Sequence, residues 1–233
     1  MEHFERIYAY QAQAYHAMIS AEDTDGNLLP ALNQIVPLRS KRVLDLGSGT
    51  GRIPLMIQKI AAQTAALDLN LPMLEEQDNQ RRRVGGEWSI SQGDMRMLPF
   101  VSGWAQIVIA GWGIGHLCSW FEQDWKMQIG LILKEMERVI CLGGTLIIIE
   151  TMSTGSHVPT PPTSVLANYY TWLESEHGFN RRVIQTDYRF NTVDEAVAKT
   201  EFFFGNELVR AIRQNAWTRV PEWTGIWSKR RVT

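Results

Sequence analysis

The sequence has little cysteine, no strong excess of charge and no long apolar run. Its two cysteines, Cys118 and Cys141, lie in apolar surroundings without a CxxC pair or the spacing of metal ligands. We therefore expect two buried free thiols, with neither a disulfide nor a metal site. Twenty-three basic and twenty-five acidic residues leave a net charge of −2, too balanced to favour nucleic acid as a partner.

The apolar segments are also short. The longest clean one, residues 145–149 with their neighbours, is much shorter than a membrane span. The first six residues include acids and lack the apolar core of a secretory signal. With 233 residues and 45% apolar content, the chain is expected to form one cytoplasmic domain with one core and no membrane partner.

Short β-type segments alternate with segments of helical periodicity, which is typical of a parallel α/β sheet. The predicted strands are residues 42–46, 64–68, 88–92, 106–110 and 145–149. Near-continuous Val, Ile and Leu in the last two predicts strands covered on both faces. An apolar stripe from Trp125 to Val139 predicts a helix that ends at Gly143 and Gly144.

The two ends of the chain are expected to complete this layout. Helical spacing of Tyr8, Ala12, Tyr15 and Ile19 predicts an N-terminal helix against the sheet. Residues 151–164 are rich in Ser, Thr, Gly and Pro and are interpreted as a mobile loop. The remaining predicted elements are a helix at 166–175, a strand at 183–190, a helix opened by the capping box 192–195 and a strand at 224–228.

A glycine loop lies between the first predicted strand and the helix after it. Gly47, Gly49 and Gly51 permit a tight turn and the close approach of a ligand to the backbone. In a parallel sheet, ligands bind beyond the carboxyl ends of the strands, where this loop is predicted to lie. Arg52 follows Gly51, so the G-x-G-x-x-G pattern of a dinucleotide site is incomplete.

Three acids stand at or near successive strand ends. Asp45 could accept from a cationic amino group, Asp68 from both hydroxyls of a ribose, and Asp94 from the exocyclic amine of adenine, with Met95 against the ring. A zwitterionic amino acid joined to adenosine would use all three. Taken singly, Asp45 could instead cap its loop and Asp68 could cap a helix; the three together favour a ligand.

These residues resemble a known family. The segments 43–52, Asp68, 93–100 and 143–146 look like the successive motifs of class I S-adenosylmethionine-dependent methyltransferases, and the resemblance is close over roughly residues 40–151. It implies a Rossmann-like, doubly wound α/β sheet of seven mostly parallel strands, with the last strand antiparallel. Gln106 departs from the family pattern, in which many members have an acid, and we interpret it as a surface change.

The resemblance also implies the cofactor, S-adenosylmethionine, with S-adenosylhomocysteine as product, and the residues that bind it. Asp45 and the 47–51 loop would hold the methionine portion, Asp68 the ribose, and Asp94 with Met95 the adenine. The full set of expected cofactor residues is Asp45, Gly47, Ser48, Gly49, Gly51, Asp68, Leu69, Asp94, Met95, Gly111 and Trp112.

Residues near the reacting methyl group have two interpretations each. His116 could deprotonate an acceptor or simply pack and hydrogen-bond locally. Trp112 could stack on the cofactor or fill the cleft. Tyr15 could shield the sulfonium through its ring, and Glu150 could orient a substrate; helix packing and loop capping are the alternatives. Tyr169, in an aromatic cluster, could line an acceptor pocket or the core.

We expect a single methyltransferase domain over residues 1–233, with a helical cap at 1–39, a cofactor-binding core at 40–151, and sheet completion with the acceptor pocket at 152–233. The expected reaction is methyl transfer to O, N or C of a small molecule, by a monomer or homodimer. The alternatives are a non-catalytic scaffold or cofactor-binding regulator and, in the same fold, an NAD-dependent oxidoreductase. Binding of S-adenosylmethionine or of NAD distinguishes the two enzymes.

Overall fold

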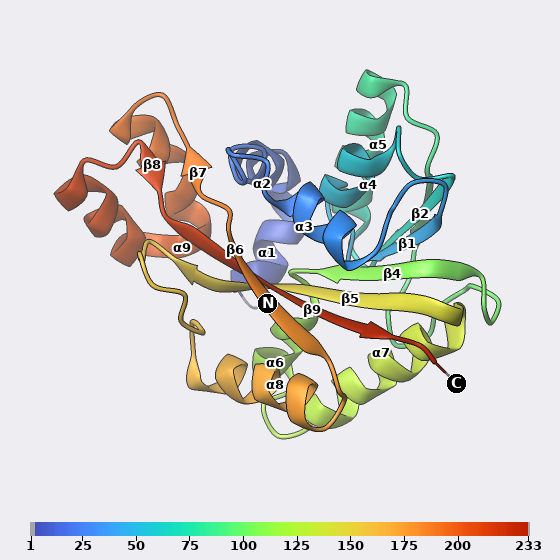
Figure 1. The fold of residues 1–233 in the computed structure, drawn as a ribbon. Coiled ribbons are helices and arrows are strands. Elements are labelled where there is room, and N and C mark those ends of the chain that lie inside the picture. Colours follow the sequence, from blue (N-terminus) through green and yellow to red (C-terminus); the bar gives the residue numbers. More distant parts are fainter. Residues whose placement is uncertain (1–2, 233) are drawn as a thin grey trace.

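A seven-stranded sheet organises the protein, seen here in a computed structural model that describes residues 3–232. Met1, Glu2 and Thr233, the ends of the predicted domain, lie outside the described residues. The strand order is β3-β2-β1-β4-β5-β9-β6, with β9 antiparallel to β5 and β6 and the other pairs parallel (Figure 1). The predicted mostly parallel sheet with an antiparallel last strand is confirmed. The strands are β1 Arg42–Leu46, β2 Gln63–Asp68, β3 Ser89–Gln92, β4 Ala105–Gly111, β5 Ile140–Thr154, β6 Asn180–Gln185 and β9 Glu222–Arg230.

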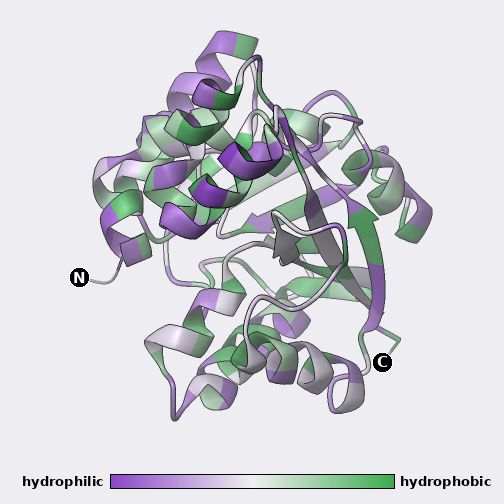
Figure 2. Cartoon of the chain, turned by 90° about the vertical axis from the view of Figure 1, so that its left-hand side faces the viewer, coloured by the Kyte–Doolittle hydropathy of each residue, from purple (hydrophilic) through white to green (hydrophobic). Residues whose placement is uncertain are grey.

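Helices cover both faces of this sheet because its central strands are apolar on both sides. Val43, Ile107 and Ile147 pack in one buried cluster with α3 and α4, whereas Leu44, Val108 and Leu146 pack in another with α7 and α8. The flanking helices combine hydrophilic and hydrophobic residues, as Figure 2 shows. They are α3 Leu28–Ile35, α4 Arg52–Ile57, α5 Leu71–Val84, α6 Leu117–Trp120, α7 Trp125–Val139 and α8 Ser164–Ser175.

The N-terminal segment forms two helices where the periodicity predicted one. They are α1 His3–Tyr10 and α2 Ala12–Ile19, and Gln11 between them has the non-helical angles φ −130° and ψ 30°. Apolar spacing continues across this break, so the pattern could not reveal it. Helix α2 packs against α9, Val193–Asn215, in a cluster with Met18 and Ile212.

The predicted cap of α9 is confirmed, since the Thr192 hydroxyl accepts from the Glu195 amide at 3.0 Å. The same helix contains a kink that the sequence analysis did not predict. Gly205 has φ 72° and ψ −171°, so it divides α9 into two helical parts. Phe202, Phe203 and Phe204 come immediately before this kink.

Two predicted boundaries around β5 are wrong. Helix α7 ends at Val139 and β5 begins at the next residue, so Gly143 and Gly144 lie within the strand and do not cap the helix. A Cβ at Gly144 would lie 2.8 Å from the Gln106 carbonyl oxygen, so glycine is needed there for close backbone approach. The loop predicted to begin at residue 151 begins only after Thr154, because β5 pairs with β9 as far as that residue.

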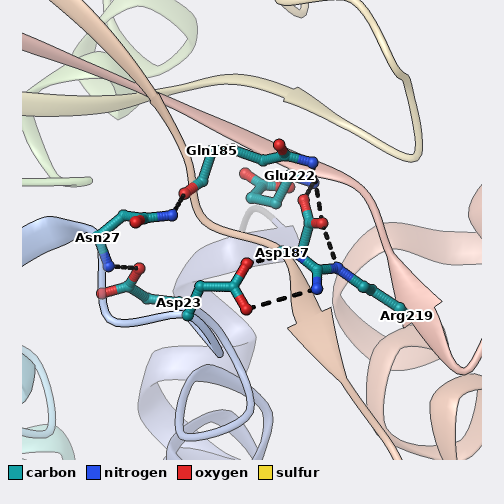
Figure 3. Close-up of polar contacts among 7 residues, drawn as sticks. Asp23, Asn27, Gln185, Asp187, Arg219 and Glu222 are labelled. Atoms are coloured by element: carbon teal, nitrogen blue, oxygen red, sulfur yellow. Dashed lines mark hydrogen bonds and ion pairs between the residues drawn. The ribbon is translucent and has the colours of Figure 1, made fainter.

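The strand predicted at 183–190 is interrupted. Strand β6 ends at Gln185, and a separate two-residue strand, β7 Tyr188–Arg189, pairs with β8 Arg219–Val220. Between them Asp187 accepts from the Glu222 amide at 3.0 Å and from Arg219 Nε at 2.6 Å (Figure 3). These bonds turn the chain out of the sheet, and a buried carboxylate of this kind is not encoded in strand periodicity.

The structure agrees in part with the prediction of two buried free thiols. Cys118 and Cys141 are both free, as predicted, but only Cys118 is buried and Cys141 is partly exposed. Within residues 3–232, every helix is too short or too polar to cross a membrane.

Candidate active site

Two cavities lie beyond the carboxyl ends of β1, β2, β4 and β5. The larger encloses about 1010 Å³ and the smaller about 460 Å³. They share the glycine loop, the end of β4 and the N-terminal helices as common walls. The residues that line both are Tyr8, Tyr15, Gly47, Gly49, Gly111, Trp112, His116 and Ser119. A molecule in one cavity would therefore meet a molecule in the other at these walls.

The glycine loop has the backbone conformation that the sequence predicts. Gly47, Gly49 and Gly51 have φ of 65°, 52° and 91°, in the left-handed region that side chains with a Cβ disfavour. A Cβ at Gly51 would also lie 2.7 Å from Cγ of Gln77. Gly51 precedes α4 directly and lies outside the linings of both cavities, whereas Gly47, Ser48 and Gly49 line the larger one.

Asp68, at the end of β2, lines the smaller cavity and is 7% exposed. Its Oδ2 accepts from the Gly49 amide and its Oδ1 from the Asn70 amide, both at 2.8 Å. Burial raises the pKa of Asp68, while these amide bonds oppose that shift. The carboxylate thus connects the strand end to the glycine loop. Leu69, Met95, Gly111 and Trp112, all predicted cofactor residues, line the same cavity.

Asp94 also lines the smaller cavity, but its carboxylate already has a partner. Arg96 Nη2 lies 2.6 Å from Asp94 Oδ2, and the Arg96 amide donates to Oδ1 at 2.8 Å. The hydrogen bonds from Arg96 lower the pKa of Asp94. Sequence reasoning considered Asp94 without Arg96, although a cation two residues away was visible.

Asp45 is the buried acid that the sequence places at the end of β1. It lines the larger cavity and is 1% exposed, and its Oδ2 has no hydrogen-bond partner among residues 3–232. Burial, with a contribution from the charge on Asp68, raises the pKa of Asp45 well above its usual value. A buried acceptor with an open site fits the cationic amino group that the sequence analysis assigned to it.

His116 lines both cavities and is held by α1. Its Nε2 lies 2.8 Å from the Tyr8 hydroxyl, and its ring stacks on Trp120 with centroids 5.3 Å apart. Burial lowers the pKa of His116 to about 4, so the ring is neutral at pH 7. Tyr8 was not among the predicted site residues, although its place on the same helical face as Tyr15 was visible.

The three predicted substrate residues have different positions. Tyr15 lines both cavities, and its ring meets that of Tyr8 edge-on at 5.6 Å. Glu150 lines the larger cavity. Tyr169 is fully buried in the main core and is absent from both linings, whereas its neighbour Tyr170 lines the larger cavity.

A buried ion pair in the larger cavity was missed by sequence reasoning. Arg52 Nη1 lies 2.8 Å from Glu22 Oε2, and the Arg52 guanidinium lies 4.2 Å from the centre of the Trp112 ring. The Tyr188 hydroxyl donates to the same Glu22 oxygen at 3.0 Å. The four residues come from four separate segments, so no local pattern could have associated them.

Metal-assisted chemistry has no residue cluster to support it in the described part of the chain. Within residues 3–232, no group of three or more His, Cys, Asp or Glu side chains has the arrangement of a metal site. The titratable groups of the two cavities are instead acids, tyrosines, a histidine, a cysteine and two arginines, Arg52 and Arg96. This composition is suited to binding an organic ligand with polar ends and to moving a proton.

Comparison with known proteins gives a family match over the strands that form this site. Residues 44–148 match the family model described as "Methyltransferase domain". Malonyl-[acyl-carrier protein] O-methyltransferase from Legionella pneumophila is 26% identical over 60% of this chain and 47% of its own length. Demethylmenaquinone methyltransferase from Thermus thermophilus is 29% identical over 56% of this chain and 53% of its own length. The chain thus spans about half the length of the curated relatives it matches.

Solved structures share the fold over most of the chain. A SAM-dependent methyltransferase from Aquifex aeolicus aligns over 85% of this chain and 87% of its own, with a TM-score of 0.54 at 14% identity. At this identity the likeness concerns the fold. The domain match, the strand order and the placement of the motifs at the strand ends agree with one another. Residues 44–148 therefore match a methyltransferase domain family, and the chain has the fold of S-adenosylmethionine-dependent methyltransferases.

Proposed function

We propose that the protein transfers the methyl group of S-adenosylmethionine to a small organic acceptor bound in the larger cavity. The observation that supports this most strongly is the pair of cavities with a common wall at Gly47, Gly111 and Trp112. A group-transfer enzyme needs a donor site and an acceptor site that meet at the reacting atoms. The two cavities satisfy that requirement within one domain.

The residues of the smaller cavity and of the glycine loop fit the donor. Asp68 would accept from the ribose hydroxyls, and Asp45, with its partnerless Oδ2, would accept from the ammonium of the methionine portion. Leu69 and Met95 offer apolar contact to the adenine ring. When bound, the donor supplies an electrophilic methyl group on a sulfonium. The family's other expected contacts, from Ser48 and Asp94, are part of the same proposal.

The N-terminal helices would exclude water from the reaction. Tyr8 and Tyr15 line both cavities, and Phe203 of α9 contacts Tyr15 with ring centroids 5.6 Å apart. Tyr8 and Tyr15 are part of the common wall, and an aromatic face attracts a cationic sulfonium. A dry site also strengthens the electrostatic contacts of Asp45 and Asp68.

The larger cavity suits an acceptor with an apolar body. Aromatic and aliphatic side chains dominate its wall, including Ile53, Leu166, Phe203 and Phe204. Residues 160–163 of the proline-rich loop complete it, so the C-terminal part of the chain contributes to acceptor binding. The curated relatives named above act on a malonyl-[acyl-carrier protein] and on demethylmenaquinone. We propose a small apolar acceptor, methylated at O, N or C.

Replacing Asp68 tests the donor site. Asp68→Ala is expected to weaken S-adenosylmethionine binding by about 1–3 kcal/mol, a rise in Kd of about fivefold to 150-fold, because charge-assisted bonds to the ribose are lost. Isothermal titration calorimetry measures the Kd of S-adenosylmethionine, and a second titration with NAD tests the alternative cofactor. Asp78→Ala, which removes a partly exposed acid from the ion pairs of α5 outside both cavity linings, is the matched control and should leave Kd unchanged. Wild-type protein that binds NAD alone would contradict the proposal.

A further inference from the structure

Glu150 has an unusual position in the larger cavity. The Trp112 amide donates to the Ile149 carbonyl at 2.6 Å, so Glu150 directly follows the point where β5 meets the turn after β4. That turn is part of the wall common to both cavities. The residue is 5% exposed and lines the larger cavity. Its carboxyl group is therefore close to the boundary between the donor and acceptor sites.

One oxygen of this carboxyl is held and the other is open. Oε1 accepts from the Gly115 amide at 2.8 Å. Within residues 3–232 the structure gives Oε2 no hydrogen bond. A Cβ at position 115 would lie 3.1 Å from Oε2 and 3.2 Å from Leu166 Cδ2. Glycine at 115 thus leaves room for the carboxyl, and the amide bond orients it.

The groups around Glu150 are neutral. They are Tyr8 from α1, Cys118 from α6, and Tyr169 and Tyr170 from α8, while the residue opposite on β9 is Gly225. His116 follows Gly115, whose amide binds Glu150, and lines the same cavity. No ion pair to Glu150 is formed among the described residues. Burial raises the pKa of Glu150 to about 8, against the opposing effect of the Gly115 amide. The carboxyl is a stronger base than an exposed glutamate.

His116, the base that sequence reasoning considered, is less suited to this role. Its Nε2 is engaged by the Tyr8 hydroxyl at 2.8 Å, and burial lowers the pKa of its ring to about 4. A base with so low a pKa has little affinity for the proton of an acceptor. His116 instead packs between Phe4 and Trp120 and holds α1 over the site.

We propose that Glu150 is the catalytic proton acceptor of the larger cavity. This inference rests on the proposed function. The acceptor's O–H or N–H group loses its proton to Glu150 Oε2 as its oxygen or nitrogen bonds to the methyl carbon. The carbon–sulfur bond breaks at the same time, and its electron pair neutralises the sulfonium. The acceptor class is therefore a hydroxyl or amine compound; a free carboxylate has no proton to lose and needs no base.

Direct titration tests the proton-carrying group without turnover. Infrared spectra are recorded between pH 6 and 10 on protein saturated with S-adenosylhomocysteine. We expect a protonated carboxyl component that disappears with a midpoint near pH 8 in the wild type and is lost in Glu150→Gln, whereas the bands of Asp45 and Glu222, whose pKa values burial also raises, are common to both proteins. Glu222→Gln, which removes a buried carboxyl outside both cavity linings, should retain that transition. A wild-type spectrum without such a transition, or one unchanged in Glu150→Gln, would overturn the proposal.

Methyl transfer from labelled S-adenosylmethionine tests the acceptor class with three probes: 4-ethylphenol, benzylamine and octanoate. Transfer to the phenol or the amine should rise with pH through about 8 and fall 10²- to 10⁴-fold in Glu150→Gln. The Kd of S-adenosylhomocysteine should stay within twofold, which separates this proposal from a failure of donor binding. Transfer to octanoate alone, or an equal rate in the variant, overturns the assignment. If no probe is methylated, the infrared transition decides.

Discussion

Arg52→Met is expected to lower the free energy of unfolding by about 3–5 kcal/mol at pH 7. The side chains of Arg52 and Glu22 are 16% and 4% exposed, so removal of the cation leaves a buried carboxylate without its counter-ion. Arg52 also loses its contact with the Trp112 ring. Because Glu22 follows α2 and Arg52 begins α4, the loss should loosen the N-terminal helices from the glycine loop. Chemical denaturation measures it.

Two further variants separate the pair from its parts. Arg52→Met with Glu22→Gln should recover more than half of the loss, because no charge is then buried and Tyr188 keeps a hydrogen-bond acceptor. Lys126→Met removes a pair with Glu176 whose side chains are 55% and 58% exposed. It should change stability by less than about 1 kcal/mol. A similar loss in Lys126→Met and Arg52→Met would show that burial of the Arg52 pair has no energetic role.

Glu150→Gln is expected to become more stable than the wild type as pH rises. The pKa of Glu150 is about 8 in the folded protein, whereas its ordinary value, expected in the unfolded chain, is 4.5. Between pH 4.5 and pH 8 the folded protein therefore keeps a proton that the unfolded chain releases. Wild-type stability therefore falls as pH rises through this window, and glutamine has no proton to lose. The difference in unfolding free energy should grow from about zero at low pH to about 5 kcal/mol above pH 8.

Denaturant unfolding from pH 4 to pH 9 measures that difference. Glu135→Gln provides a control of opposite sign, because the hydrogen bond from Arg138 lowers the pKa of Glu135. The stabilising effect of Glu135 is present above its ordinary pKa and is lost as pH falls through the lowered value. Glu135→Gln should therefore lower the free energy of unfolding at neutral pH, and this loss should become smaller in acid. A difference for Glu150→Gln that does not change with pH would contradict the burial of a titrating group.

Much of the sheet could be predicted because strand formation depends on short apolar runs. Strand β1 has the predicted bounds, and β4 differs by one residue at each end. The errors occur where a distant partner changes a local pattern. Asp187 ends β6 through bonds to Arg219 and Glu222, and Gly144 enters β5 because the Gln106 carbonyl of β4 comes close.

The predicted cofactor residues followed from the same rule, since parallel strands bring their carboxyl ends to one edge. Asp45, Asp68 and Asp94 all line the cavities at this edge. The hydrogen-bond and ion-pair partners of these three acids did not follow from the strand order. Arg96 pairs with Asp94, two amides hold Asp68, and Asp45 keeps a partnerless oxygen. Charge and hydrogen bonding depend on which groups the fold brings within a few ångströms.

The sequence by itself determined the α/β class, the glycine loop between strand and helix, the acids at the strand ends and the near-neutral charge, because these depend on local pattern and composition. It also restricted the two cysteines to free thiols. The tertiary structure decided the division of the site into two cavities, the ion pair between Arg52 and Glu22, and the raised pKa of Glu150. Those properties arise from burial and from contacts between segments far apart in the chain, which periodicity does not record.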